Sequence, residues 1–190
     1  STRKESSAAS DVYKRQLEYR AYNIKDIIND LRKENRFGFE EMTYLLLFGE
    51  LPTANELQEF QNLLASRRTL PEFFIRETIL TNPSSDVMNS MSRCILALAS
   101  YDEKVSDISI ENVLEQSFGL IADFPLLAIY SYQSYVHYFK KESLYIHYPD
   151  PKMTTAENIL RMLRPDCHYT EVEAKVLDIA LILHMEHGGG

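Results

Sequence analysis

The sequence lacks several features that would place it in well-known classes of protein. It has two cysteines in 190 residues, Cys94 and Cys167, which are too few for a disulfide framework. We therefore expect a cytoplasmic location, where thiols stay reduced. No apolar run approaches the roughly 18 residues that span a bilayer, and no charged start with a following apolar stretch indicates a signal peptide. These absences predict a protein with no membrane partner.

Basic charge and common catalytic motifs are scarce as well. The formal net charge of −8 argues against a general nucleic-acid partner, because nucleic acids attract basic surfaces. The chain has no Gly-x-Ser-x-Gly, Cys-x-x-Cys or P-loop motif, so nucleophilic catalysis has no support. A hydrophobic share of 45% and a charged share of 25% are typical of a globular protein with one core.

What the sequence contains is a succession of helix signals. Capping boxes of the form Thr-x-x-Glu begin at Thr53, Thr154 and Thr170, and Asn23, Ser109 and Asp123 can cap further helices. Pro125 would then lie in the first turn of the helix that Asp123 begins. The expected helices cover residues 24–31, 39–48, 54–67, 72–80, 86–100, 110–122, 123–139, 154–163 and 170–187. Residues 19–22 are expected to form an extended or turn segment, and the predicted fold class is all-α.

The last of these helices ends in a group of polar residues. Apolar residues at helical spacing predict a buried face that leads to His187; they are Val172, Val176, Ala180 and Leu183. His184 lies three residues earlier on the same face, and three glycines end the helix. The pattern indicates a site, although a structural histidine beside a C-cap gives the same pattern. A zinc site is disfavoured, because zinc-protease helices place their two histidines one residue farther apart.

Four segments together resemble the citrate synthase family. The segment at residues 181–190 reads LILHMEHGGG and is similar to the family's active-site signature. The other three follow the family's order and read LEYRAYNI at 17–24, YLLLFGELPT at 44–53 and TTAENILRML at 154–163. The resemblance implies that residues 17–190 form part of the family's large helical domain, cut at both ends, with the small domain absent.

The first 16 residues fall outside this resemblance. They are polar and aperiodic, as in a disordered leader. Residues 6–16 also resemble one translated frame of a transposase adapter used in sequencing libraries. We therefore expect residues 1–16 to be non-native or disordered, and a natural disordered leader is the alternative.

The resemblance also implies a reaction and a set of roles. Citrate synthases join acetyl-CoA to oxaloacetate without a metal or cofactor and act as homodimers. His187 would be the catalytic donor to the thioester oxygen, with His184 and Glu186 supporting it. His147 and Gly188 would contact substrate; His147 is the substitute candidate, since Thr154 and Thr155 stand where many family members have a substrate-contacting histidine. The family's acidic base lies beyond this C-terminus.

Several alternatives stay open. Within the family, a 2-methylcitrate synthase would use propionyl-CoA in place of acetyl-CoA. From another class, the chain could be a non-catalytic helical interaction module. Because the base is missing, we expect the 190-residue chain to be inactive alone. We also expect it to expose apolar surface and self-associate.

Overall fold

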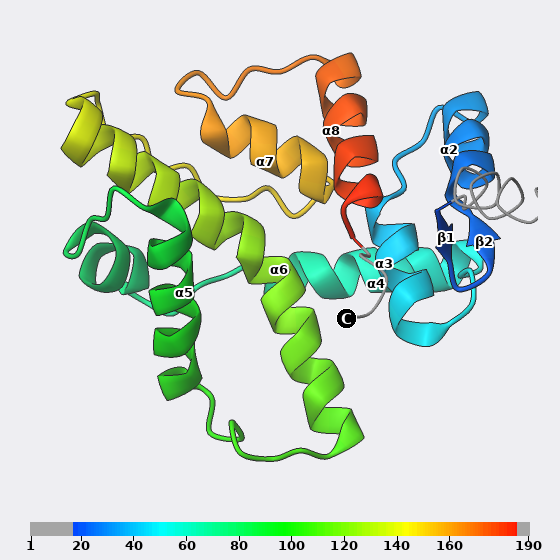
Figure 1. Cartoon of the computed structure of the whole chain (residues 1–190), viewed down its shortest axis with the longest axis horizontal. Coiled ribbons are helices and arrows are strands. Elements are labelled where there is room, and N and C mark those ends of the chain that lie inside the picture. The colour runs from blue at the N-terminus through cyan, green and yellow to red at the C-terminus, as the bar shows by residue number, and fades with distance from the viewer. Residues whose placement is uncertain (1–16, 186–190) are drawn as a thin grey trace, which may run out of the picture.

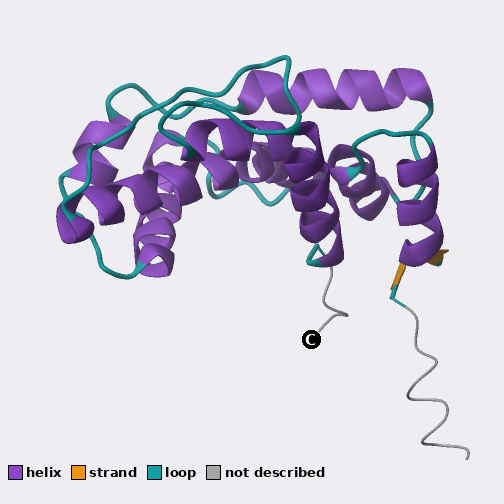
Figure 2. Cartoon of the chain, turned by 90° about the horizontal axis from the view of Figure 1, so that it is seen from above, coloured by secondary structure: helices purple, strands orange, loops and turns teal. Residues whose placement is uncertain are grey.

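A computed structural model describes residues 17–185 of the chain and leaves residues 1–16 and 186–190 undescribed. Most of the described chain is helical, and the two short strands lie at one end of the molecule (Figures 1 and 2). The helices in chain order are α2 (Ile24–Lys33), α3 (Phe39–Phe48), α4 (Ala54–Arg67), η1 (Ile75–Leu80), α5 (Val87–Leu98), η2 (Ala99–Tyr101), α6 (Ile110–Tyr135), η3 (Val136–Lys140), α7 (Thr155–Leu163) and α8 (Glu171–Leu183). The all-α prediction is confirmed.

The described chain begins with a tight hairpin that leads into α2. Strands β1 (Glu18–Tyr19) and β2 (Tyr22–Asn23) pair antiparallel. The two residues between them, Arg20 and Ala21, have φ of 49° and 70°, which is the backbone of a two-residue turn. Asn23 then caps α2 by accepting a hydrogen bond from the Lys25 amide. The expected extended segment and helix cap are both confirmed.

Local capping signals also fix most of the other helix starts. The three predicted capping boxes at Thr53, Thr154 and Thr170 are present at the starts of α4, α7 and α8. Gly49 ends α3 with φ of 88°, a conformation that glycine adopts without strain. The helix expected over residues 72–80 is shorter: Phe73 has φ of 64°, and η1 covers Ile75–Leu80 as a π-helix.

The prediction of two helices at residues 110–139 is wrong. One helix, α6, runs from Ile110 to Tyr135 with Pro125 inside it. Asp123 is therefore an interior residue and not a cap. A proline removes one backbone hydrogen bond and bends a helix, and Figure 1 shows that α6 changes direction partway along its length. Packing on several neighbours holds the helix together across this defect.

The core is organised around α6, which contacts α4, α5, α7 and η1. By length and composition alone, the segment Ile110–Lys140 could cross a membrane, so the expectation that no stretch is apolar enough needs correction. One face of this segment instead lies in the largest buried cluster, with Leu126, Leu127, Tyr130 and Cys94. A central helix of a helical domain has the same composition.

A second buried cluster joins the hairpin, α2, α3 and the end of α8 through Tyr19, Ile24, Leu31, Met42, Leu45 and Ile182.

Candidate functional site

The helix that leads to the predicted catalytic histidine starts as expected but ends early. Thr170 and Glu173 form its capping box, and Arg164 pairs with Glu173 at 2.6 Å. The helix ends at Leu183, with His184 as its C-cap at φ −111° and ψ 7°. The expectation that one helix carries both histidines to the glycines is therefore wrong, because His184 already lies outside the regular helix.

The face of α8 that was expected to be buried is largely exposed. Val172 and Val176 are 71% and 63% exposed, whereas Ala174, Asp178 and Ile182 are buried. The apolar spacing correctly predicts a helix, but Val172 and Val176 lie on its outer face. The helix packs on α3 and α7 through the other face, which carries the polar Asp178.

His184 secures the end of α8. Its Nδ1 atom lies 2.7 Å from the carbonyl oxygen of Ala180, and its amide donates to Leu181 at 3.1 Å. Because a carbonyl oxygen only accepts, Nδ1 must carry a hydrogen in this contact. The ring is exposed and folds back on its own helix. The predicted catalytic His187, together with Glu186 and Gly188, lies outside the described residues, so their roles stay predictions.

A buried carboxylate that the sequence reading missed joins α8 to α3. Asp178 is 2% exposed and accepts hydrogen bonds from the amides of Gly38 at 2.8 Å and Phe39 at 3.1 Å. It therefore caps α3, whose own N-cap residue, Gly38, has no side chain to do so. Burial raises the pKa of Asp178 to about 6, although the two amide hydrogen bonds oppose that rise. A glycine at an N-cap is the one local sign that the acceptor must come from elsewhere.

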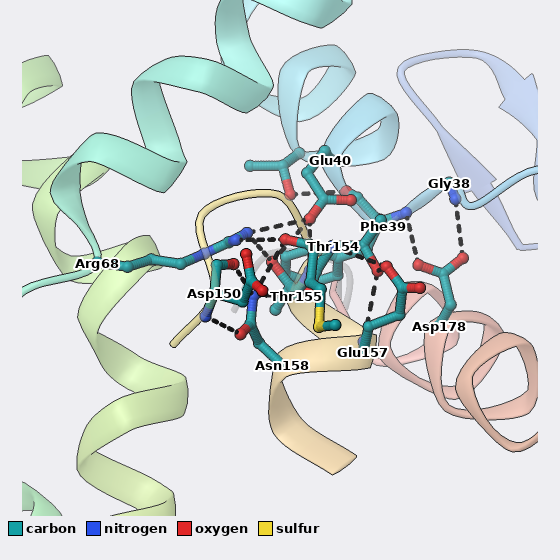
Figure 3. A network of polar contacts seen from close by, with 12 residues as sticks. Gly38, Phe39, Glu40, Arg68, Asp150, Thr154, Thr155, Glu157, Asn158 and Asp178 are labelled. Atoms are coloured by element: carbon teal, nitrogen blue, oxygen red, sulfur yellow. Dashed lines mark hydrogen bonds and ion pairs between the residues drawn. The ribbon is translucent and has the colours of Figure 1, made fainter. Parts of the chain in front are cut away.

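A second missed group lies at the start of α7 (Figure 3). Oε1 of Glu40 accepts from the amide and the hydroxyl of Thr155, each at 2.8 Å, and pairs with Nη2 of Arg68 at 3.3 Å. Arg68 also donates to the Thr155 hydroxyl and to the Met153 carbonyl, both at 2.8 Å. The Glu40 and Arg68 side chains are 2% and 6% exposed, so this is a buried ion pair that ties α3, α4 and α7 together.

The hydroxyls of Thr154 and Thr155 at the start of α7 both form hydrogen bonds within the fold. Thr154 caps α7 in its box with Glu157, while the Thr155 hydroxyl donates to Glu40 and accepts from Arg68. Both hydroxyls therefore already have protein partners.

His147 is held in the loop before α7. Its Nε2 lies 3.2 Å from the Pro165 carbonyl, its own carbonyl accepts from the Tyr130 hydroxyl at 2.9 Å, and its ring stacks on Tyr145. Within residues 17–185, none of these contacts involves His184, so the structure does not bring the two histidines together. In the same range, no group of three or more His, Cys, Asp or Glu side chains could hold a metal ion.

Comparison with known proteins identifies the family. The model of the citrate synthase C-terminal domain matches residues 2–190, a range that includes most of the predicted leader. A citrate synthase from Haloferax volcanii is 33% identical over 91% of the chain and 43% of its own length. A protein from Corynebacterium glutamicum named 2-methylcitrate synthase 2 is 26% identical over 90% of the chain and 43% of its own length. The chain thus spans less than half of these relatives.

A solved structure supports the same fold. Citrate synthase from Thermoplasma acidophilum, in a ternary complex with carboxymethyl coenzyme A and oxaloacetate, superposes with a TM-score of 0.73. The superposition covers 90% of this chain and 41% of that one, at 22% identity. Together with the family match over nearly every residue, these findings show that the chain belongs to the citrate synthase family.

Proposed function

We propose that this chain belongs to an acyltransferase that condenses acetyl-CoA with oxaloacetate and, after water hydrolyses the thioester, releases citrate and CoA. The observation that carries this proposal is the family match, which extends through residue 190 and so includes both histidines of the LILHMEHGGG segment. The related Thermoplasma structure contains a coenzyme A derivative and oxaloacetate, which supports the same pair of substrates here.

The difficult step in this reaction is removal of a proton from the weakly acidic acetyl methyl group. A carboxylate base takes the proton while a hydrogen-bond donor stabilises charge on the thioester oxygen. We assign the donor role to His187, since a neutral imidazole is close in acidity to the enol it must stabilise. The base comes from a part of the family's sequence that residues 1–190 do not match.

The remaining sequence assignments join the proposal as supporting roles. His184 holds the end of α8 through Ala180, so we assign it, with Glu186, to the support of His187. We assign substrate contact to Gly188 and His147. The reaction needs neither a metal nor a prosthetic group, because acid–base chemistry and hydrogen bonding suffice for it.

Propionyl-CoA is the second candidate substrate, because matching relatives include a 2-methylcitrate synthase. One extra methylene is discriminated by about 1–3 kcal/mol of pocket packing. A complete enzyme of either type would therefore prefer its own acyl-CoA by about 10- to 200-fold.

We also propose a cytoplasmic homodimer. Large apolar side chains are exposed on α5, on α6 and on the loop between them; Leu96 is 76%, Ile108 89% and Ile110 83% exposed. Large apolar side chains left exposed on neighbouring elements are typical of surfaces that a partner covers.

The test uses the product of the complete gene that encodes this chain. CoA release is measured with oxaloacetate and either acetyl-CoA or propionyl-CoA, and the preferred acyl-CoA decides between the two candidate substrates. His187→Gln should lower kcat about 10²- to 10³-fold, the effect of removing one donor to a developing oxyanion. The exposed His168 offers a matched control, His168→Gln, which should change kcat less than about twofold. Absence of CoA release with either substrate would instead favour a non-catalytic interaction module.

A further inference from the structure

The end of α8 is satisfied by groups that are distant in sequence as well as local ones. The last carbonyls of a helix have no partners within the helix. His184 serves two of them, on Ala180 and Leu181. The third, on Ile182, accepts from the Met185 amide at 3.3 Å and from the Tyr19 hydroxyl at 2.6 Å. The Tyr19 hydroxyl therefore binds a residue 163 positions later in the sequence, in the last turn of α8.

Tyr19 is itself held rigidly. Its side chain is 0% exposed, and the hairpin that carries it is closed by the Ile24 amide, which donates to Leu17 at 3.0 Å. Arg20, the next residue, donates to the Leu46 carbonyl of α3 at 2.9 Å. Because the hydroxyl is fixed in this way, it restrains the position of its acceptor, the Ile182 carbonyl. An exposed tyrosine would instead move with the helix end.

A second contact fixes the same face of α8. Asp178 lies four residues before Ile182, one helical turn away, and binds the amides at the start of α3. Packing between these two anchors is tight, since a Cβ added to Gly38 would lie 3.1 Å from Cδ1 of Ile182. Translation or rotation of the last turn of α8 would break both contacts.

We propose that Tyr19 is a positioning residue, whose hydroxyl fixes the last turn of α8, the helix that precedes His187 in the sequence. Its catalytic consequence rests on the proposed function of His187. The structural consequence does not, and the two can be measured separately.

The first experiment uses the 190-residue chain labelled with ¹⁵N-histidine. Tyr19→Phe keeps the ring and removes only the hydroxyl. Tyr22→Phe is the matched control, because Tyr22 lies in the same hairpin and is 38% exposed. We expect Tyr19→Phe to shift the imidazole signals of His184 and His187 and to speed amide exchange at residues 183–185 at least about tenfold. Tyr22→Phe should change neither, and equal behaviour of the two variants would overturn the proposal.

The second experiment uses the complete enzyme. Tyr19→Phe should lower kcat by about 10- to 100-fold, as expected for a donor displaced by an ångström or less, and leave the KM for both substrates unchanged. A rise in KM with kcat unchanged would overturn the catalytic part. If even the unsubstituted enzyme does not turn over, the proposed function fails while the histidine signals still decide the role of Tyr19.

Native-state exchange on the unsubstituted chain provides an answer if Tyr19→Phe does not fold. The amides of His184 and Met185 donate to Leu181 and Ile182, and we expect their protection to match that of the middle of α8. Exchange at these two amides about 100-fold faster than in the middle of the helix would show a frayed end and overturn the proposal.

Discussion

Replacing Glu40 with glutamine tests whether the buried ion pair at the start of α7 holds three helices together. Glutamine has nearly the same shape and can still accept from the Thr155 amide and hydroxyl, which bind Oε1 of Glu40 at 2.8 Å. It removes the negative charge beside Arg68, whose Nη2 lies 3.3 Å away. The substitution therefore isolates the charge from the hydrogen bonds.

The magnitude follows from burial. The Glu40 and Arg68 side chains are 2% and 6% exposed, so loss of the carboxylate leaves the guanidinium charged in the interior with neutral acceptors alone, which are the residue-40 amide oxygen, the Thr155 hydroxyl and the Met153 carbonyl. Removing one partner of a buried pair costs about 3–5 kcal/mol. The new amide does not compensate for this cost, because Oε2 of Glu40 is buried without a hydrogen-bond partner, and an NH₂ group there would be unsatisfied as well.

The assay is urea unfolding at pH 7, followed by far-UV circular dichroism. The matched control is Glu77→Gln, because Glu77 pairs with Arg76 at 2.9 Å but the side chains are 62% and 67% exposed. An exposed pair of this kind contributes about 0–1 kcal/mol. The free energy of unfolding should therefore fall several times more for Glu40→Gln than for Glu77→Gln. Equal losses in the two variants would refute the reasoning.

Three further predictions concern pH, packing and association. Burial raises the pKa of Asp123 to about 7, so the folded chain retains a proton that the unfolded chain loses above about pH 4, and stability falls as the pH rises toward 7. Asp123→Asn should remove this slope and stabilise the chain at pH 8 by at most about 4 kcal/mol; urea unfolding at pH 5 and pH 8 measures it, and an unchanged slope would contradict the assignment. Gly38→Ala places a Cβ 2.3 Å from Cδ1 of Leu31 and should cost about 1–3 kcal/mol in urea unfolding. The helical control Gly119→Ala meets nothing within 4 Å and should add about 0.5–1 kcal/mol; a similar loss in both would argue against tight packing. The chain should sediment as a dimer or larger species at micromolar concentration because of its exposed apolar side chains, and a monomer throughout would count against the proposed homodimer.

The helices that the sequence predicts well are those whose ends are specified within four residues. The capping boxes at Thr53, Thr154 and Thr170 each place donor and acceptor three residues apart, so a local reading finds them. The prediction failed at Asp123 and Pro125, where local signals indicate a helix boundary. There, packing of α6 on four neighbours overrides the loss of one backbone hydrogen bond, and no window of sequence contains that information.

At the candidate site, too, the sequence predicts what neighbouring residues specify and misses what distant residues determine. The LILHMEHGGG segment resembles the family's signature within ten consecutive residues, yet the apolar spacing predicted the wrong face of α8 as buried. Val172 and Val176 are apolar and exposed, while Asp178 is charged and 2% exposed. A buried aspartate is disfavoured unless its oxygens are paired, and its partners, the amides at the start of α3, lie about 140 residues earlier in the chain.

The supports of α7 and α8 are long-range for a physical reason. Helix ends leave backbone groups that the helix cannot satisfy itself, and in a core these groups need polar partners from another element. Glu40 serves the start of α7, Asp178 the start of α3 and Tyr19 the end of α8, and each bond spans at least 115 positions. Two of the three residues, Tyr19 and Glu40, lie in the first helices and hairpin of the described chain, and both act on helices near its end. The placement of α8 therefore depends on the hairpin at residues 18–23 and on α3 as well as on its own sequence.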